Sequence, residues 1–191
     1  CIEGGRVVGV QFANGETLAA DLVICNGDPA QIYRSLVPQS DRKRWSDRRI
    51  DGLKYSMGLY VMYFGTTCQY DEVEHHTIVF GDEYEELLQR IFAGAPAGDD
   101  LSLYLHRPTA TDPTLAPTGK DTFYVLAPVP NLQRHDWQAV RDQVRERVID
   151  ILEERVLPNL REHMDVCFDL DPAQFDTDYK SRWGAGFSIA P

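Results

Sequence analysis

Residues 99–132 constrain the fold most strongly, because they hold two short apolar runs separated by a segment that is poorly suited to a helix. The runs, 101–105 and 122–129, have the length and the Leu, Tyr, Phe and Val content of buried strands. Three prolines, four threonines and a glycine lie between them, and they restrict φ and favour turns. The sequence therefore predicts a strand, an ordered loop and a second strand.

The residues that follow the first run are the first candidates for a functional role. His106, Arg107 and Pro108 stand where the strand is predicted to end, and loops that leave a rigid strand often carry binding or catalytic groups. A simpler alternative is that Arg107 forms an ion pair with an acidic neighbour such as Asp112.

Composition limits the class of protein. The 191 residues suffice for one domain, with room for a piece of another, and the net charge of −11 argues against a nucleic-acid partner. Four scattered cysteines without a CxxC pair predict free thiols in a reducing compartment. No apolar run approaches the roughly 20 residues that cross a bilayer. The first residue is Cys rather than Met, so we expect a fragment of a longer protein.

The rest of the chain predicts an α+β fold, with a mixed or antiparallel sheet flanked by helices. Asn14-Gly15 predicts a hairpin turn within residues 6–18, and Asp28 with Pro29 predicts the start of a helix that ends near residue 36. Further strands are predicted at 21–25, 55–64, 77–80 and 164–170, and further helices at 82–92, 135–156 and after Asp171. The charged run at 40–49 is predicted to be an amphipathic helix or a connector.

Motifs for specific chemistry are sparse. Asn26, Gly27 and Asp28 lie between a predicted strand and a predicted helix, where the backbone either forms a capped turn or approaches a phosphate or flavin. Spacing favours the capped turn, since the chain has no GxGxxG. His75 and His76 are adjacent and the other histidines are isolated in sequence, so we predict no metal site.

Four segments resemble the bacterial and fungal phytoene desaturases, which are FAD-dependent carotenoid desaturases. They are residues 54–66, 75–92, 99–132 and 184–191, in the family's order. Residues 20–29 resemble the segment where the family's chain leaves its flavin domain, with Asn26-Gly27 where many relatives carry Asn-Ala.

The resemblance implies the substrate domain of a Rossmann-type flavoprotein of the amine-oxidase-like class. Residues 30–182 would form this domain, and 1–29 and 183–191 would return to the flavin domain. The candidate cofactor-binding residues are Asn26, Gly27 and Asp28. The chain has neither the family's glycine fingerprint nor its C-terminal flavin segment. We therefore expect FAD and turnover in the full-length parent, and neither in the fragment alone.

The implied reaction is dehydrogenation of a linear C40 polyene in carotenoid biosynthesis. A hydrocarbon is recognised by apolar area and shape, so alternate residues of strands 55–64 and 101–105 are expected to line its tunnel. The candidates are Tyr60, Met62, Phe64, Leu103 and Leu105.

A desaturase must also stabilise positive charge and accept a proton. The polar groups nearest a predicted strand end are His106, Arg107 and Asp112, which become catalytic candidates. The alternative is that His106 and Arg107 only anchor the loop 109–120.

The family works at membranes, so the resemblance implies a cytoplasmic, peripherally attached enzyme with a quinone or oxygen as electron acceptor. Trp45 or residues 129–132 would contribute an apolar docking patch. Two alternatives stay open: a desaturase or isomerase of another polyene, and a non-catalytic lipid-binding or membrane-docking module. The parent gene discriminates between them: absence of both a glycine fingerprint upstream of Cys1 and a flavin-binding segment after Pro191 would favour the module.

Overall fold

The computed structural model describes residues 1–134 and 136–190, which form two compact units that divide between Leu53 and Lys54. This division differs from the predicted segments 1–29, 30–182 and 183–191. The helix after Asp28 belongs to the first unit, and Tyr55 and Gly58 form isolated bridges with Ile189 and Ala185 within the second. Assignment of the two ends to a flavin domain stays a prediction.

The first unit consists of small hairpins and short helices. β1 (Ile2–Glu3) pairs with β2 (Arg6–Val7), and β3 (Gly9–Gln11) pairs with β4 (Thr17–Ala19). The predicted hairpin is confirmed, and its Gly15 has a φ of 90°, which an L side chain rarely adopts. The helices are α1 (Pro29–Ser35), a 3₁₀ turn (Gln39–Asp41) and α2 (Asp47–Asp51).

The predicted strand at 21–25 is wrong. These residues form no strand, although Leu22 and Ile24 are as apolar as strand residues should be. Their side chains are 76% and 87% exposed. A strand requires hydrogen bonds from a neighbouring backbone, and no strand in the described part of the chain pairs with this segment.

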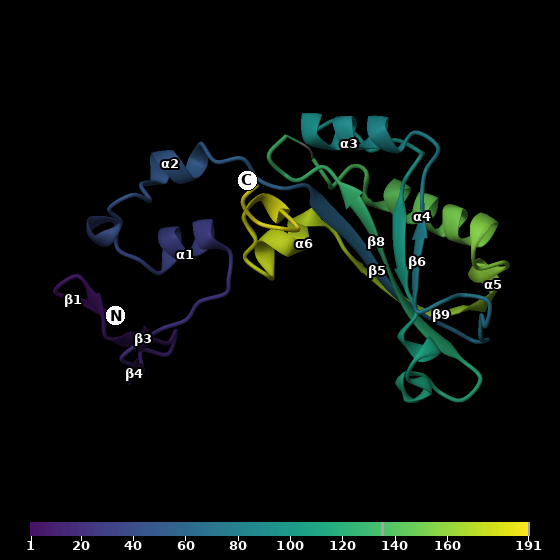
Figure 1. Ribbon diagram of the computed structural model, residues 1–191, viewed down its shortest axis with the longest axis horizontal. Coiled ribbons are helices and arrows are strands. Elements are labelled where there is room, and N and C mark those ends of the chain that lie inside the picture. The colour runs from purple at the N-terminus through teal and green to yellow at the C-terminus, as the bar shows by residue number, and fades with distance from the viewer. Residues whose placement is uncertain (135, 191) are drawn as a thin grey trace. The chain divides into compact units, whose positions relative to one another are not determined.

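The second unit is built on a five-stranded sheet with the order β6-β7-β8-β5-β9, and all neighbouring strands are antiparallel (Figure 1). Its elements are β5 (Gly58–Thr66), β6 (His76–Val79), α3 (Tyr84–Ala93), β7 (Leu103–His106), 3₁₀ turns at Pro108–Ala110 and Pro113–Leu115, β8 (Asp121–Val129), α4 (Arg141–Arg155), α5 (Leu160–His163), β9 (Met164–Leu170), α6 (Pro172–Thr177) and a 3₁₀ turn at Arg182–Gly184. The predicted combination of helices with an antiparallel sheet is confirmed.

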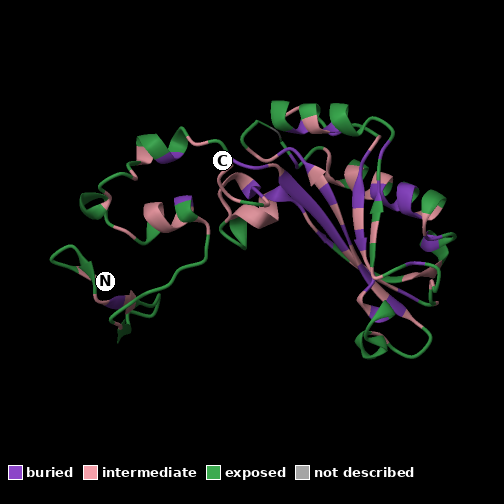
Figure 2. Ribbon diagram, viewed as in Figure 1, coloured by how far each residue is buried: buried purple, intermediate pink, exposed green. Residues whose placement is uncertain are grey.

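Strand alternation divides the sheet into two faces. β8 alternates between buried and half-buried residues along its whole length, and it pairs with β5 from Gly58↔Val129 to Thr66↔Asp121 (Figure 2). Directly paired residues point to the same side. The side packed against α3 and α4, which we call the covered face, carries the core. The other side, the open face, carries half-buried and exposed residues, except at Leu59 and Val61 of β5, which are buried.

The covered face holds most of the apolar core. Leu87 and Ile91 of α3 and Val148 and Leu152 of α4 are each 3% exposed or less, and they belong to one cluster with the strand residues. The strand members of this cluster include Tyr60, Met62, Phe64, Leu103, Leu105, Phe123, Val125, Ala127 and Val129.

Two predicted helices are shorter than expected. α4 begins at Arg141 rather than 135, because the preceding residues form a turn around Trp137, whose indole Nε1 donates to the Pro130 carbonyl at 2.9 Å. The start predicted at His135 lies outside the described residues. The charged run at 40–49 becomes a 3₁₀ turn and α2, which Ser46 caps by accepting from Arg49 N.

Candidate functional site

The open face carries a row of aromatic rings that crosses four neighbouring strands. Phe168 of β9 stacks on Tyr63 of β5 with ring centroids 4.9 Å apart, and Tyr63 lies 5.8 Å from Tyr124 of β8. Tyr124 in turn lies 5.7 Å from Tyr104 of β7. The row follows from the register, since Tyr63 is paired with both Tyr124 and Phe168.

This aromatic row is apolar and accessible. Phe168 is 58% exposed, and Ile78 and Val166 on the same face are 61% and 60% exposed. Burial raises the pKa of Tyr63 above its ordinary value, and burial followed by a hydrogen bond with Tyr104 raises the pKa of Tyr124 to about 12. These phenols are therefore neutral at physiological pH, which suits contact with a hydrocarbon.

The predicted substrate-binding residues lie on the other side of the same strands. Tyr60, Met62, Phe64, Leu103 and Leu105 belong to the covered face, and none is more than 2% exposed. Contact between these five residues and a substrate stays a prediction. Sequence reasoning missed the open-face residues. Tyr63 and Tyr104 are next to predicted positions, so the strand alternation was their signal, whereas Tyr124 and Phe168 join them only through the strand pairing.

Of the three catalytic candidates, His106 lies on the open face. It ends β7 directly opposite His76, and its Nε2 lies 2.7 Å from Nε2 of His75. Burial, and next the neighbouring His75 and His76, lower its pKa below the usual range of histidine. A neutral imidazole in this position accepts a proton weakly.

The same geometry bears on the prediction of no metal site. Potential ligand atoms of His75, His76 and His106 all lie within 4.8 Å of one another. Sequence spacing did not indicate this cluster, because it arises from the register of β6 and β7.

Arg107 is an anchor of the fold, 5% exposed and bonded on all sides of its guanidinium. Nε donates to Asp121 Oδ2 at 2.8 Å, Nη1 to the Val73 carbonyl at 2.9 Å and Nη2 to Asp71 Oδ1 at 3.2 Å. Thr109 donates to the other oxygen of Asp121 at 2.6 Å. The pair therefore joins both ends of the loop between β7 and β8, as the anchoring alternative predicted.

Asp112, the third candidate, lies exposed in that loop. Its Oδ1 accepts from Thr114 Oγ1 at 2.6 Å and from Thr114 N at 3.0 Å, and these bonds, the side-chain bond first, lower the pKa of the carboxyl group. The expected ion pair of Arg107 with Asp112 is replaced by pairs with Asp121 and Asp71. Direct catalytic roles for His106, Arg107 and Asp112 stay predictions.

The three predicted cofactor residues lie in the first unit. Asn26 and Gly27 are exposed, and Asp28 caps α1 by accepting from Gln31 N at 3.0 Å. A carboxylate at this helix start repels a phosphate, so these residues do not by themselves fit a flavin diphosphate. A role for Asn26, Gly27 and Asp28 near FAD stays a prediction.

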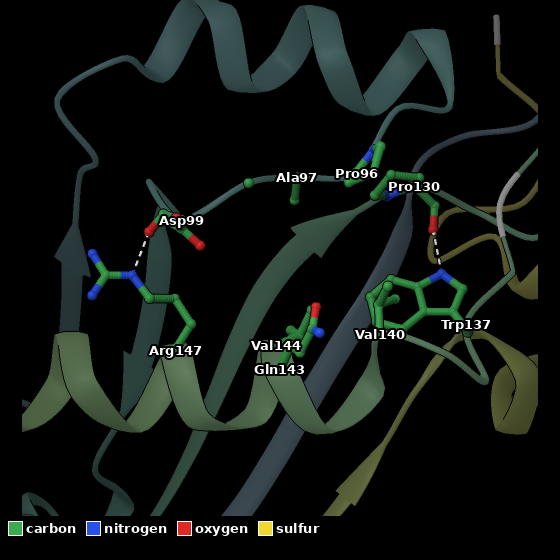
Figure 3. A pocket seen from close by; sticks show the side chains of 10 residues that line it. Pro96, Ala97, Asp99, Pro130, Trp137, Val140, Gln143, Val144 and Arg147 are labelled. Carbon is green, nitrogen blue, oxygen red and sulfur yellow. Dashed lines mark hydrogen bonds between the residues drawn. The ribbon is translucent and has the colours of Figure 1, made fainter.

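A small pocket lies at the start of α4, against residues 96–99 (Figure 3). Its lining includes Trp137, Val144 and Arg147, and Arg147 Nε donates to the Asp99 carbonyl. The volume of about 100 Å³ is below the roughly 300–1,000 Å³ of typical ligand pockets. A long polyene requires a larger surface, such as the open face.

No helix among residues 1–134 and 136–190 has both the length and the apolar character needed to cross a bilayer.

Curated relatives match the whole chain. It is 43% identical to the neurosporene-forming phytoene desaturase of Cereibacter sphaeroides, covering 100% of this chain and 38% of that protein. It is 40% identical to the lycopene-forming phytoene desaturase of a Paracoccus species, covering 99% of this chain and 38% of the relative. The chain thus spans well under half the length of the curated relatives it matches.

Two further comparisons bear on the fold and the family. An oxidoreductase from Methanosarcina mazei has a similar fold, with a TM-score of 0.57, 18% identity, and coverage of 90% of this chain and 35% of that one. No family model matches the chain. The matches to curated relatives extend over the whole of this chain, and they are sufficient: this chain belongs to the phytoene desaturase family.

Proposed function

We propose that this chain is the substrate-binding part of an FAD-dependent phytoene desaturase that dehydrogenates a linear C40 carotenoid precursor. The observation that carries the proposal is the aromatic row on the open face, in a chain homologous throughout to phytoene desaturases. Five strands spaced by about 4.8 Å give this face a width of about 19 Å. This surface is long, neutral and apolar, as is the C40 polyene that we propose it binds.

The chain's own contribution is binding and orientation. Stacked and tilted rings can pack along a conjugated chain, and burial of apolar surface supplies roughly 25 cal/mol per Å². The covered-face residues Tyr60, Met62 and Phe64 lie in the core of the same strands and hold the sheet in shape. We assign FAD binding to the full-length protein, mainly to residues other than 26–28.

The wider setting belongs to the same proposal. The parent would be a cytoplasmic enzyme that docks peripherally on a membrane, where its substrate dissolves, and passes electrons to a quinone or oxygen. The sheet would belong to the substrate domain of a Rossmann-type flavoprotein. The fold likeness to an oxidoreductase and the names of the relatives support this view.

The test uses the full-length parent with FAD and phytoene in liposomes, with oxygen or a quinone, and follows coloured products by chromatography. Phe168→Ala removes a ring from the aromatic row, and Phe92→Ala removes an equally exposed ring on α3, at 58% and 59% exposure. Full burial of a phenyl side chain contributes about 1.5–3 kcal/mol, and substrate could bury only the exposed part of Phe168, roughly half, so we expect F168A to lower kcat/KM by about four- to twelvefold. F92A should leave it unchanged.

The outcomes separate the parts of the proposal. Equal effects of F168A and F92A would show that the open face does not contact substrate. Loss of flavin from F168A with an unchanged KM would mean that the flavin domain covers this face instead. If the protein binds flavin but forms no coloured product from phytoene, its substrate is another polyene.

A further inference from the structure

We propose that His75, His76 and His106 form a binding site for one late first-row divalent metal ion, of the zinc class, at the edge of the open face. Two of the imidazoles come from the paired strands β6 and β7, about thirty residues apart in the sequence, and the third comes from the residue that precedes β6. This inference is independent of the proposed desaturase function.

The register of β6 and β7 creates the cluster. His76, the first residue of β6, pairs directly with His106, the last residue of β7. His75 precedes β6, and its carbonyl accepts a hydrogen bond from Arg107 N at 2.9 Å, which holds it beside β7. The ring centroid of His75 lies 4.4 Å from that of His76 and 4.6 Å from that of His106.

The distances are close to those that a tetrahedral ion requires. Zn–N bonds of about 2.0–2.1 Å place ligand nitrogens about 3.3 Å apart. The ligand atoms here lie within 4.8 Å of one another, and the His75 and His106 Nε2 atoms are 2.7 Å apart. Side-chain rotations that change the distances between the ligand nitrogens by about 1.5 Å or less would therefore close the site around an ion.

Neighbouring hydroxyl groups hold two of the rings as metal ligands are usually held. His75 Nδ1 contacts Thr111 Oγ1, and His76 Nδ1 lies 2.7 Å from the Tyr104 hydroxyl. In the tautomer whose Nδ1–H donates to the hydroxyl oxygen, each ring presents the lone pair of Nε2. An ion bound through Nε2 of His75 and His76 would therefore leave both hydroxyl contacts in place.

As a hydrogen-bond network, the cluster has one unsatisfied atom. The His75 and His106 Nε2 atoms share one N–H···N hydrogen bond across 2.7 Å, in which one ring donates and the other accepts, but Nδ1 of His106 is buried with no hydrogen-bond partner among the described residues. Buried polar atoms are rarely left so. A divalent ion that replaces the single proton between the two Nε2 atoms would bind the lone pairs of both.

Ligand chemistry selects the ion. Imidazole nitrogens suit zinc, copper and nickel, whereas magnesium and calcium prefer oxygen. His76 is exposed, so water reaches the site and can take a fourth position. The bound ion would join the edge strand β6 to β7 and, through Thr111, to the loop that follows β7.

To test the proposal, the protein is first stripped of metal with a chelator and then titrated with Co²⁺, followed by Zn²⁺. The visible spectrum of bound cobalt reports the coordination, and calorimetry gives the number of ions bound per chain. We expect one ion per chain, a four- or five-coordinate cobalt spectrum, displacement by Zn²⁺ and no response to Mg²⁺. His106→Gln should weaken binding at least about tenfold, because even changes to groups behind the ligands cost about that much.

His163→Gln is the matched control, since His163 also contacts a threonine hydroxyl but lies outside the cluster. It should leave affinity and stoichiometry unchanged. His106→Phe keeps a ring in the aromatic row, so circular dichroism of this variant confirms folding while binding is lost. Equal affinities of H106Q, H163Q and the unmodified protein, or more than one weakly bound ion, would overturn the proposal and leave the cluster as part of the aromatic face.

Discussion

Replacement of Arg107 by Met should destabilise the second unit strongly, because it leaves a buried carboxylate without its cation. The side chain of Arg107 is 6% exposed and that of Asp121 is fully buried. After the change, Asp121 keeps two donors, the Tyr70 amide at 2.8 Å and the Thr109 hydroxyl at 2.6 Å, but no positive charge. The Val73 carbonyl also loses a donor.

The magnitude follows from the burial of the pair. Removing one partner of a buried ion pair costs about 3–5 kcal/mol. With an m-value of about 2 kcal/mol per M, the urea midpoint of R107M should fall by about 1.5–2.5 M. Far-UV circular dichroism and tryptophan fluorescence, recorded together, would follow unfolding, and Arg107→Lys should give an intermediate loss because it restores charge without the planar fork.

Lys120→Met provides the control. It removes an ion pair with Asp165 whose N···O distance is 2.6 Å but whose side chains are 35% and 51% exposed. Exposed pairs contribute at most about 1 kcal/mol, so its midpoint should move by less than about 0.5 M. If R107M shifts the midpoint no further than K120M, burial does not make the Arg107 pair essential and the reasoning fails.

Three smaller predictions concern other positions. Burial raises the pKa of the Cys167 thiol, so its alkylation rate should keep rising with pH beyond the roughly 8.5 of a free cysteine; a normal profile in a mass-resolved iodoacetamide assay would contradict this. Gly184→Ala should lower stability by more than about 1 kcal/mol in urea unfolding, because Gly184 has a φ of 63° and a Cβ there would lie 2.1 Å from the Pro172 carbonyl oxygen; an unchanged midpoint would refute it. Thr114→Ala should raise the pKa of Asp112, because it removes the hydroxyl that donates to the carboxylate. The lowered pKa makes Asp112 stabilising above its unfolded pKa, and that stabilisation is lost as the pH falls through the folded pKa. An unchanged pKa of Asp112 in a carbon-detected NMR titration would show that Thr114 is not the cause.

Local patterns sufficed for most elements of the fold. β9 matches its predicted range, and α1 begins at the predicted cap, because an apolar run and a capping residue are both recognisable in the local sequence. The segment at 21–25 shows the limit of such patterns. Its apolar residues are typical of a strand, but a strand also depends on a partner that local sequence does not specify.

The site depended more on register than on composition. Alternation was visible in residues 55–64 and 101–105, but it did not say which alternate set faces the helices. The choice of Tyr60 and Leu103 therefore selected the covered face. The meeting of His75, His76 and His106 depends equally on strand pairing, which residue spacing along the chain does not reveal.

The position of β5 in the chain has a consequence for folding. It is the first strand of the large sheet to be synthesised, yet it lies between two other strands, and these partners, β8 and β9, come far later: Tyr60 hydrogen-bonds Asp169, 109 residues on. Contacts of such long sequence separation pay loop-closure entropy before they form and slow folding. During translation this apolar strand remains unpaired until most of the unit has left the ribosome. We therefore expect the chain to fold slowly and to rely on chaperones while β5 is exposed.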